Sequence, residues 1–174
     1  LEDGRAKIRK SLNSICEKYG VRDRVHYVRG GKLARLIKNN ISKYNLTGTA
    51  SDLPQGYRIL VPGQVEDDAS IELGADKVRT NLDLLRNVRA NHPDAIILYK
   101  PHPDVIAGLR KGHIDPETAL EFCDQILENA NIAGLLDQVD GVHTMTSLTG
   151  FEALLRGRDV TTYGAPFYAG WGLT

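Results

Sequence analysis

Tyr57-Arg58-Ile59-Leu60-Val61 and Ala95-Ile96-Ile97-Leu98-Tyr99 are the two stretches that decide the fold of this chain. Both are short apolar runs without polar alternation, which is typical of strands buried on both faces of a parallel sheet. Between them lies a segment with apolar residues at helical spacing, namely Val78, Leu82, Leu85 and Val88. Strand, helix and strand in this order predict a βαβ unit.

The alternation continues toward the C-terminus. A helix is predicted over 117–130, because Asp115-Pro116 supplies an N-cap and a proline at the first helical position. A strand over 141–144, a helix over 149–155 and a strand over 160–163 follow. This order predicts an α/β fold with a Rossmann-like, doubly wound parallel sheet. Ligands of such sheets bind at the carboxyl ends of the strands.

The first fifty residues have a different character. Amphipathic helices are predicted over 5–19 and 33–44, with a β-prone run at Val25–Val28 between them. Residues 1–50 hold twelve Lys or Arg against four Asp or Glu, whereas the whole chain is balanced at 22 against 22. We therefore predict a basic, mainly helical segment over 1–50 and a nucleotide-binding domain over 51–174, joined by a polar linker at 45–56. The helices are expected to pack on the domain through Ile8, Leu12, Ile15, Leu33, Leu36 and Ile37.

Composition narrows the class of protein. The 174 residues are 41% hydrophobic and 25% charged, the mixture of a globular protein, and a net charge of zero gives no argument for a nucleic-acid partner. No stretch approaches the ~20 apolar residues of a membrane span, and Leu1–Arg5 lacks the build of a signal peptide. Cys16 and Cys123 are predicted to be buried free thiols on helices, which suits a reducing cytoplasm.

The loop after the first strand, 62–70, contains the adjacent acids Glu66, Asp67 and Asp68. It is either a solvated acidic loop or a set of polar contacts to a sugar or acceptor hydroxyl, with Gly63 letting the backbone approach the ligand. A metal site is disfavoured, because the loop has no Asp-X-Asp pattern and no nearby histidine.

The loop after the second strand reads Lys100-Pro101-His102-Pro103-Asp104. The two prolines stiffen it and hold His102 extended, which favours an imidazole positioned to donate to a phosphate or to protonate it. The similar His92-Pro93-Asp94 comes at the start of that strand, the wrong end of the sheet for a site, and is predicted to be a turn.

The third strand runs into four hydroxyl residues at the start of a helix: Thr144, Thr146, Ser147 and Thr149. A helix N-terminus attracts anions, so this cluster predicts a phosphate site. The alternative is helix capping by Ser147 or Thr149, with Glu152 completing a capping box. The chain has no Gly-X-Gly-X-X-Gly and no Walker loop, which disfavours a dinucleotide enzyme or an NTPase. The aromatic, glycine-rich end over 163–174 is expected to line a base or sugar site or to plug an interface.

Four blocks in this order resemble the capsule polysaccharide biosynthesis family, which includes bacterial β-Kdo transferases: 63–68, 100–104, 146–154 and 163–172. The resemblance covers residues 58–174 and is loose over 1–50. It implies the C-terminal, nucleotide-sugar-binding half of a GT-B glycosyltransferase. The implied reaction is retaining transfer of Kdo from CMP-Kdo during synthesis of a capsule linker, by a protein peripheral to the cytoplasmic face of the inner membrane.

The resemblance also implies roles for residues. By similarity to the His-Pro motif of this family and of bacterial sialyltransferases, His102 would be catalytic and contact the CMP phosphate. Thr146 and Ser147 would bind the phosphate or the sugar carboxylate, and Glu152 the ribose hydroxyls. The full expected nucleotide-sugar-binding set is Gln64, Glu66, Asp67, Lys100, His102, Thr146, Ser147, Thr149 and Glu152. Neither a metal nor a cofactor is expected beyond the donor substrate.

The resemblance implies that the family's acidic Glu-Asp-Gly motif, the catalytic base and the lipid-linked glycan acceptor belong to a missing N-terminal domain. Glu2-Asp3-Gly4 matches the letters of that motif by coincidence, because Arg5-Ala6-Lys7-Ile8 after it opens a helix instead of continuing the motif. Without that domain, the 174-residue chain alone is predicted to be inactive. Two alternatives stay open. One is a catalytically silent binding or assembly module of the capsule export machinery, and the other is a GT-B transferase that uses a UDP-sugar.

Overall fold

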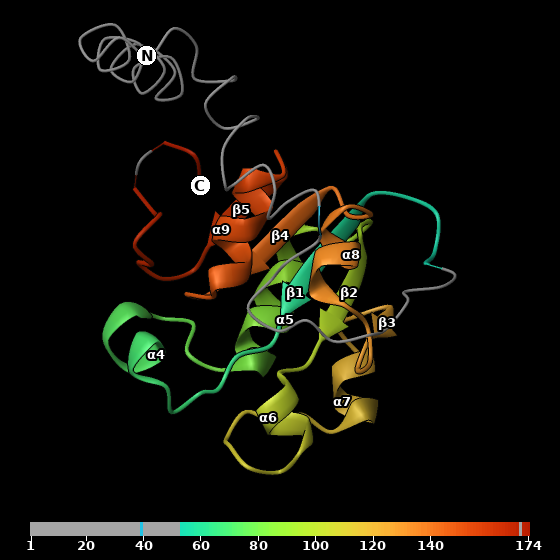
Figure 1. Ribbon diagram of the computed structural model, residues 1–174. Coiled ribbons are helices and arrows are strands. Elements are labelled where there is room, and N and C mark those ends of the chain that lie inside the picture. Colours follow the sequence, from blue (N-terminus) through green and yellow to red (C-terminus); the bar gives the residue numbers. More distant parts are fainter. Residues whose placement is uncertain (1–38, 40–52, 171) are drawn as a thin grey trace, which may run out of the picture.

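The structure, a computed structural model, describes residues 39, 53–170 and 172–174. Strands and short helices alternate along the chain (Figure 1). In order they are β1 (Arg58–Pro62), α4 (Ala69–Gly74), α5 (Asn81–Asn91), β2 (Ile96–Lys100), α6 (Pro103–Ile106), α7 (Pro116–Leu120), β3 (Gln125–Ile126), α8 (Ile132–Leu136), β4 (Gly141–Thr144), α9 (Leu148–Leu155) and β5 (Asp159–Thr162).

The strands form one five-stranded sheet in the order β3-β2-β1-β4-β5. All four pairings are parallel; Leu60, for example, pairs with Leu98 on one side and with Val142 on the other. The chain builds outward from β1 to β3 and then returns to place β4 on the opposite side of β1. This reversal confirms the predicted doubly wound sheet, and it opens a crevice between the carboxyl ends of β1 and β4.

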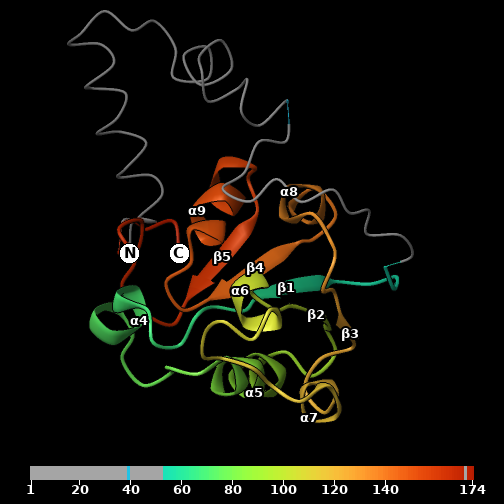
Figure 2. The same ribbon diagram turned by 60° about the horizontal axis from the view of Figure 1, so that its bottom comes forward.

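Helices cover both faces of the sheet. Figure 2 shows α5 and α7 on one face and α8 and α9 on the other. Each face buries its own apolar cluster: one combines β1 and β2 with α4, α5 and α7, and the other combines the sheet with α8 and α9. β1 and β2 are buried at all but their first positions, which is why the apolar runs of these two strands lack polar alternation.

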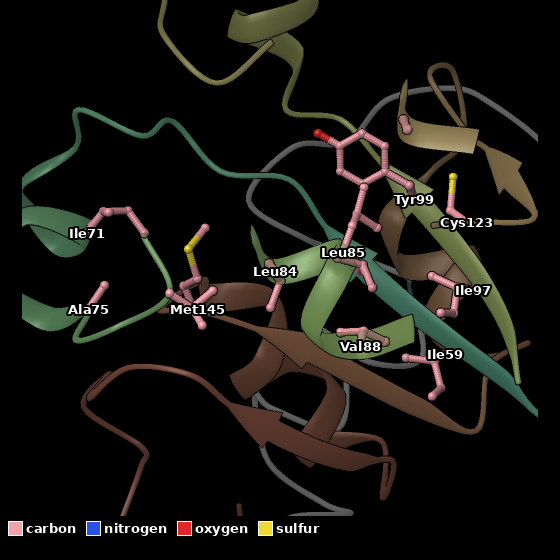
Figure 3. Close-up of a cluster of buried hydrophobic side chains, with 13 residues drawn as sticks. Ile59, Ile71, Ala75, Leu84, Leu85, Val88, Ile97, Tyr99, Cys123 and Met145 are labelled. Carbon is pink, nitrogen blue, oxygen red and sulfur yellow. The ribbon is translucent and has the colours of Figure 1, made fainter. Parts of the chain in front are cut away.

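The first cluster depends on α5. Its Leu84, Leu85 and Val88 are fully buried, and Figure 3 shows them beside Ile59 and Ile97 of the sheet. Thr80 begins the helix, because its hydroxyl accepts a hydrogen bond from the Asp83 amide at 3.1 Å. Full burial of one such side chain contributes about 1.5–3 kcal/mol, so this single helix anchors the face.

The predicted helix over 117–130 is wrong. The helix ends at Leu120, and Gln125–Ile126 form the edge strand β3 beside β2. Backbone pairing with β2 prevails over helical periodicity here: the Asp124 amide donates to the Ile97 carbonyl, and its carboxylate accepts from the Ile97 amide. Cys123 is therefore in a loop rather than on a helix, although it is buried and free as predicted.

Several predictions fall outside the described residues. They are the helices over 5–19 and 33–44, the run Val25–Val28, Cys16, and the contacts of the basic segment with the domain. The domain boundaries 1–50 and 51–174 therefore stay predictions. Of the predicted linker, residues 53–56 are described, and Leu53 packs into the second cluster. No helix among the described residues is long and apolar enough to cross a membrane.

His143 on β4 is a buried histidine whose charged form the fold disfavours. It lies edge to face with His92, 4.8 Å between ring centroids, and its Nδ1 is 3.2 Å from the Tyr163 hydroxyl. Burial, with a smaller contribution from His92, lowers the pKa of His143 from 6.5 to about 4. The unfolded chain therefore takes up a proton at a higher pH than the folded one.

We predict that the fold loses stability as pH falls from 6.5 to 4, because the depressed pKa of His143 favours the unfolded state there. At about 1.4 kcal/mol per pKa unit, this histidine contributes a loss of about 3 kcal/mol. Urea unfolding at several pH values measures it. His143→Asn, which cannot titrate, should flatten the slope in this window, and an unchanged slope would assign the acid sensitivity to other groups.

Two helical glycines should respond oppositely to alanine. A Cβ on Gly150 of α9 would press on Tyr168, with Cζ at 2.9 Å, whereas a Cβ on Gly134 of α8 meets nothing within 4 Å. Overpacking costs about 1–3 kcal/mol, and a relieved helical glycine gains about 0.5–1 kcal/mol. Urea midpoints should therefore fall for Gly150→Ala and rise for Gly134→Ala. A rise for both would mean that Tyr168 yields without cost.

A candidate ligand site at the carboxyl edge of the sheet

The loops that follow β1, β2 and β4 enclose a pocket of about 510 Å³, within the range of small-molecule sites. Three helices begin at this edge, with Asp68, His102 and Ser147 as the N-caps of α4, α6 and α9. All three N-cap residues line the pocket. The pocket therefore lies where the sheet reverses its direction of winding, the place predicted for a ligand.

Seven of the nine predicted site residues line this pocket: Gln64, Lys100, His102, Thr146, Ser147, Thr149 and Glu152. The expectation that loops distant in sequence meet at one edge is confirmed. Glu66 and Asp67 are not among the lining residues. The ligand-binding roles of all nine stay predictions.

His102 is held by its own helix cap. Its Nδ1 accepts a hydrogen bond from the Asp104 amide at 3.2 Å, and Pro103 occupies the start of α6. The same Nδ1 also lies 3.8 Å from Oδ2 of the Asp104 carboxylate. The side chain is 18% exposed. The cap and the proline thus fix the orientation of the imidazole ring in a residue that lines the pocket.

Gln64 ties the two sides of the crevice together. Its Oε1 accepts from the Thr144 hydroxyl and from the Thr146 amide, both at 3.0 Å, and its Nε2 donates to the Thr146 hydroxyl at 2.9 Å. The side chain is buried. Two of the four clustered hydroxyls therefore bind this amide, a structural use that the sequence pattern did not suggest.

The hydroxyl cluster at the start of α9 was expected either to form a phosphate site or to cap the helix. Ser147 is the N-cap, as its Oγ accepts from the Thr149 amide at 3.2 Å, so capping by Ser147 is confirmed. The expected capping box is wrong, because Glu152 lies five residues beyond Ser147 rather than three. Glu152 lines the pocket instead. Ser147 at the start of α9 and Glu152 further along it thus both line the pocket.

Lys100 is the last residue of β2 and is buried. Its Nζ donates to the carbonyls of Glu128 at 3.1 Å and of Leu127 at 3.5 Å, which hold the chain after β3. Burial lowers the pKa of Lys100, while the nearby Glu128 partly offsets this effect. Its ammonium group is therefore engaged with backbone carbonyls on one side while the residue lines the pocket.

Of the three acids in the loop after β1, Asp68 lines the pocket, whereas Glu66 and Asp67 are bound by other protein groups. The Glu66 carboxylate accepts from the Asn81 amide at 2.7 Å, and Asp67 pairs with Arg110 at 3.1 Å. Sequence reasoning missed both Asn81 and Arg110. No periodic pattern or motif marks either residue, and their contacts with this loop join segments far apart in the chain.

Gly63 lies where the loop after β1 passes close to the backbone of the loop after β2. A Cβ at this position would lie 3.1 Å from Pro101 Cα and 3.3 Å from the His102 nitrogen. The glycine therefore lets the loop after β2 approach the loop after β1. Gly63 also lines the pocket, and its expected role toward a ligand stays a prediction.

The aromatic end of the chain packs beside the site. Tyr168 is buried, donates to the Ser147 carbonyl, and forms a ring cluster with Phe151 and Phe167. The Ala165 amide donates to the Gly74 carbonyl at the end of α4, 2.7 Å away. The described residues of this end are not among those that line the pocket, and they contact the start of α9 and the end of α4. The expected base or sugar site stays a prediction.

A parallel, doubly wound sheet with a pocket at its winding reversal defines a Rossmann-like ligand-binding domain. The family model described as "Capsule polysaccharide biosynthesis protein" matches residues 5–174, and the chain belongs to this family. It is 58% identical over 141 residues to the capsule polysaccharide modification protein LipA of Neisseria meningitidis serogroup B, covering 80% of this chain. It is 39% identical to the lipopolysaccharide-processing protein LpsZ of Rhizobium meliloti, covering 94% of this chain.

Two solved structures are similar in fold and sequence. The β-Kdo 2,7 transferase KpsC of Thermosulfurimonas dismutans has a TM-score of 0.68 at 42% identity, covering 87% of this chain and 46% of that one. The β-Kdo 2,4 transferase KpsC of the same organism has a TM-score of 0.67 at 34% identity, covering 80% and 44%. This chain spans only 20% of the LipA sequence and 39% of LpsZ.

We predict that Gln64→Ala lowers the free energy of unfolding by about 1–3 kcal/mol or more, because it leaves the buried Thr144 hydroxyl without its acceptor. Gln138→Ala is the matched control, since that exposed amide makes one hydrogen bond to the Gly134 carbonyl. Urea unfolding compares them. Equal stability of the two variants would show that Gln64 does not hold the crevice together.

Proposed function

We propose that this chain is the donor-binding domain of a retaining GT-B glycosyltransferase that transfers Kdo from CMP-Kdo during capsule linker synthesis. The observation that carries the proposal is the pocket where His102, Ser147 and Glu152 meet at the winding reversal. The similarity to two Kdo transferase structures supports the reaction class. The similarity covers less than half of either structure, so the activity of the whole protein is part of this proposal.

In this proposal His102 acts on the leaving phosphate. Its Nε2–H donates to a phosphate oxygen of CMP while Nδ1 stays engaged with the Asp104 amide. Negative charge grows on the phosphate as the bond to the sugar breaks. An N–H group that is already oriented toward the phosphate therefore stabilises the transition state more than it stabilises the bound substrate. The N-terminus of the eight-residue α9 adds a second source of positive potential on the same side.

The other lining residues are assigned to binding. Thr146 and Ser147 contact the phosphate or the sugar carboxylate, and the Glu152 carboxylate accepts hydrogen bonds from the ribose hydroxyls. Gln64 and Lys100 form the walls, since their side chains already bind neighbouring loops. Glu66 and Asp67, predicted to bind the donor directly, act through Asn81 and Arg110.

The acceptor side belongs to the rest of the protein. We place the catalytic base and the lipid-linked glycan acceptor on another domain that faces this pocket, with the whole protein peripheral to the cytoplasmic face of the inner membrane. Among the described residues, no group of three or more His, Cys, Asp or Glu is arranged to hold a metal ion. The proposed reaction needs none, because the phosphate charge is met by His102 and the start of α9.

The nucleotide preference tests this proposal. We expect calorimetric titration of the 174-residue chain to show binding of CMP in preference to UMP and UDP. A preference for UDP would favour a UDP-sugar transferase. Binding of no nucleotide would favour a silent assembly module of the capsule export machinery.

The role of His102 is tested by His102→Asn. Alanine would also remove the N-cap of α6, at a cost of about 0.5–2 kcal/mol, whereas asparagine keeps a capping side chain. CMP affinity should fall about ten- to a hundred-fold, the range for losing a hydrogen bond to a charged group. His113→Ala, an exposed histidine outside the pocket lining, is the control. Undiminished CMP affinity in His102→Asn would return this histidine to a capping role.

A further inference from the structure

Arg110 is a cation of the pocket that the sequence patterns did not single out. It lies on the loop between α6 and α7 and lines the pocket. Its Nη2 donates to Asp67 Oδ1 at 3.1 Å, and the side chain is 42% exposed. A guanidinium has five N–H donors, so Asp67 orients the group without exhausting it.

The loop that carries Arg110 is fixed on its C-terminal side by a buried amide. Asn81, 1% exposed, donates through Nδ2 to the carbonyls of Gly112 and Gln64 and accepts the Gln64 amide at Oδ1, all within 2.9 Å. The Lys111 carbonyl accepts from the Glu66 amide at 3.1 Å. The loop that contains Arg110 is thereby tied to the loop after β1.

Gly112 shows how tight this attachment is. Its φ is +123°, and a Cβ there would lie 2.7 Å from both Asn81 Nδ2 and the Gln64 carbonyl oxygen. Such a conformation and such a contact both require glycine. The backbone two residues after Arg110 is therefore held in place by specific contacts, which limits where the guanidinium can go.

The acidic and basic residues that line the pocket indicate what Arg110 can bind. The lining includes the carboxylates of Asp68, Asp104 and Glu152, which repel an anionic ligand. Among the described residues, the lysines and arginines that line the pocket are Lys100 and Arg110. Lys100 donates to two backbone carbonyls, whereas Arg110 pairs with a partly exposed surface carboxylate.

We propose that Arg110 binds an anionic group of the donor, either a phosphate oxygen or the carboxylate of the sugar. This inference rests on the proposed function and names a binding residue for it. The planar guanidinium offers two parallel N–H groups, which match a carboxylate or phosphate better than an ammonium does. Asp67 holds the guanidinium oriented in the absence of ligand.

The test is calorimetric titration of the 174-residue chain with CMP-Kdo, CMP and cytidine. The variants are Arg110→Ala, Arg110→Gln and Arg110→Lys. The matched control is Arg86→Ala, which removes an exposed arginine paired with Asp83 on α5, outside the pocket lining. Unfolding curves check that each variant is folded, and Arg110→Gln keeps the length of the side chain should alanine disturb the loop.

We expect Arg110→Ala and Arg110→Gln to weaken CMP-Kdo binding about ten- to a hundred-fold, with cytidine affinity unchanged. Arg110→Lys should give an intermediate loss, and Arg86→Ala none. Added salt should weaken binding to the unsubstituted chain more than binding to Arg110→Gln, because one charge pair is gone in the variant.

The ligands separate the two anionic groups. An equal loss for CMP and CMP-Kdo would assign Arg110 to the phosphate, and a loss for CMP-Kdo alone would assign it to the sugar carboxylate. Unchanged affinity for both in Arg110→Ala would overturn this inference and leave the proposed function intact. Failure of the unsubstituted chain to bind either nucleotide would overturn the proposed function and this inference together.

Discussion

The rest of the structure depends on the hydrogen bonds of one buried amide across the winding reversal of the sheet. Parallel strands with helices on both faces necessarily leave a crevice where neighbouring connections diverge, here between β1 and β4. Gln64 spans this crevice and hydrogen-bonds the buried Thr144 hydroxyl together with the amide and the hydroxyl of Thr146. Because buried polar groups without partners are costly, this pairing sets the distance between the two loops, and with it the width of the pocket.

The sequence predicted the central strands β1 and β2 correctly because their side chains are buried almost without interruption. The central strands have apolar runs that only a doubly covered sheet accommodates, and β4 was predicted with its observed bounds, Gly141–Thr144. Prediction failed at the edge, where β3 has two residues and pairs with β2 through contacts that lie some 27 residues apart in sequence. Local periodicity favoured a helix there. Helices of four to six residues, such as α4 and α6, are too short to show periodicity at all.

The position of the site was predictable, and its internal contacts were not. Topology brings the ends of β1, β2 and β4 to one edge, so His102, Ser147 and Gln64 had to meet whatever their side chains do. Which acid faces the ligand depends on long-range partners. Glu66 binds the amide of Asn81 and Asp67 binds Arg110, and neither partner belongs to a recognisable motif. Such pairings are specified by tertiary packing, which a linear pattern of residue types does not encode.

The hydrogen bond from the Tyr168 hydroxyl to the Ser147 carbonyl gives the site a thermodynamic connection to the surface of the molecule. Ser147 caps α9 through its side chain and lines the pocket, and its carbonyl accepts the hydrogen bond from the aromatic loop. Ser147 is thus the one residue through which the pocket and this hydrogen bond of the loop are connected among the contacts described above. Because linkage is reciprocal, any coupling between the pocket and a surface that touches residues 163–168 operates with equal strength in both directions.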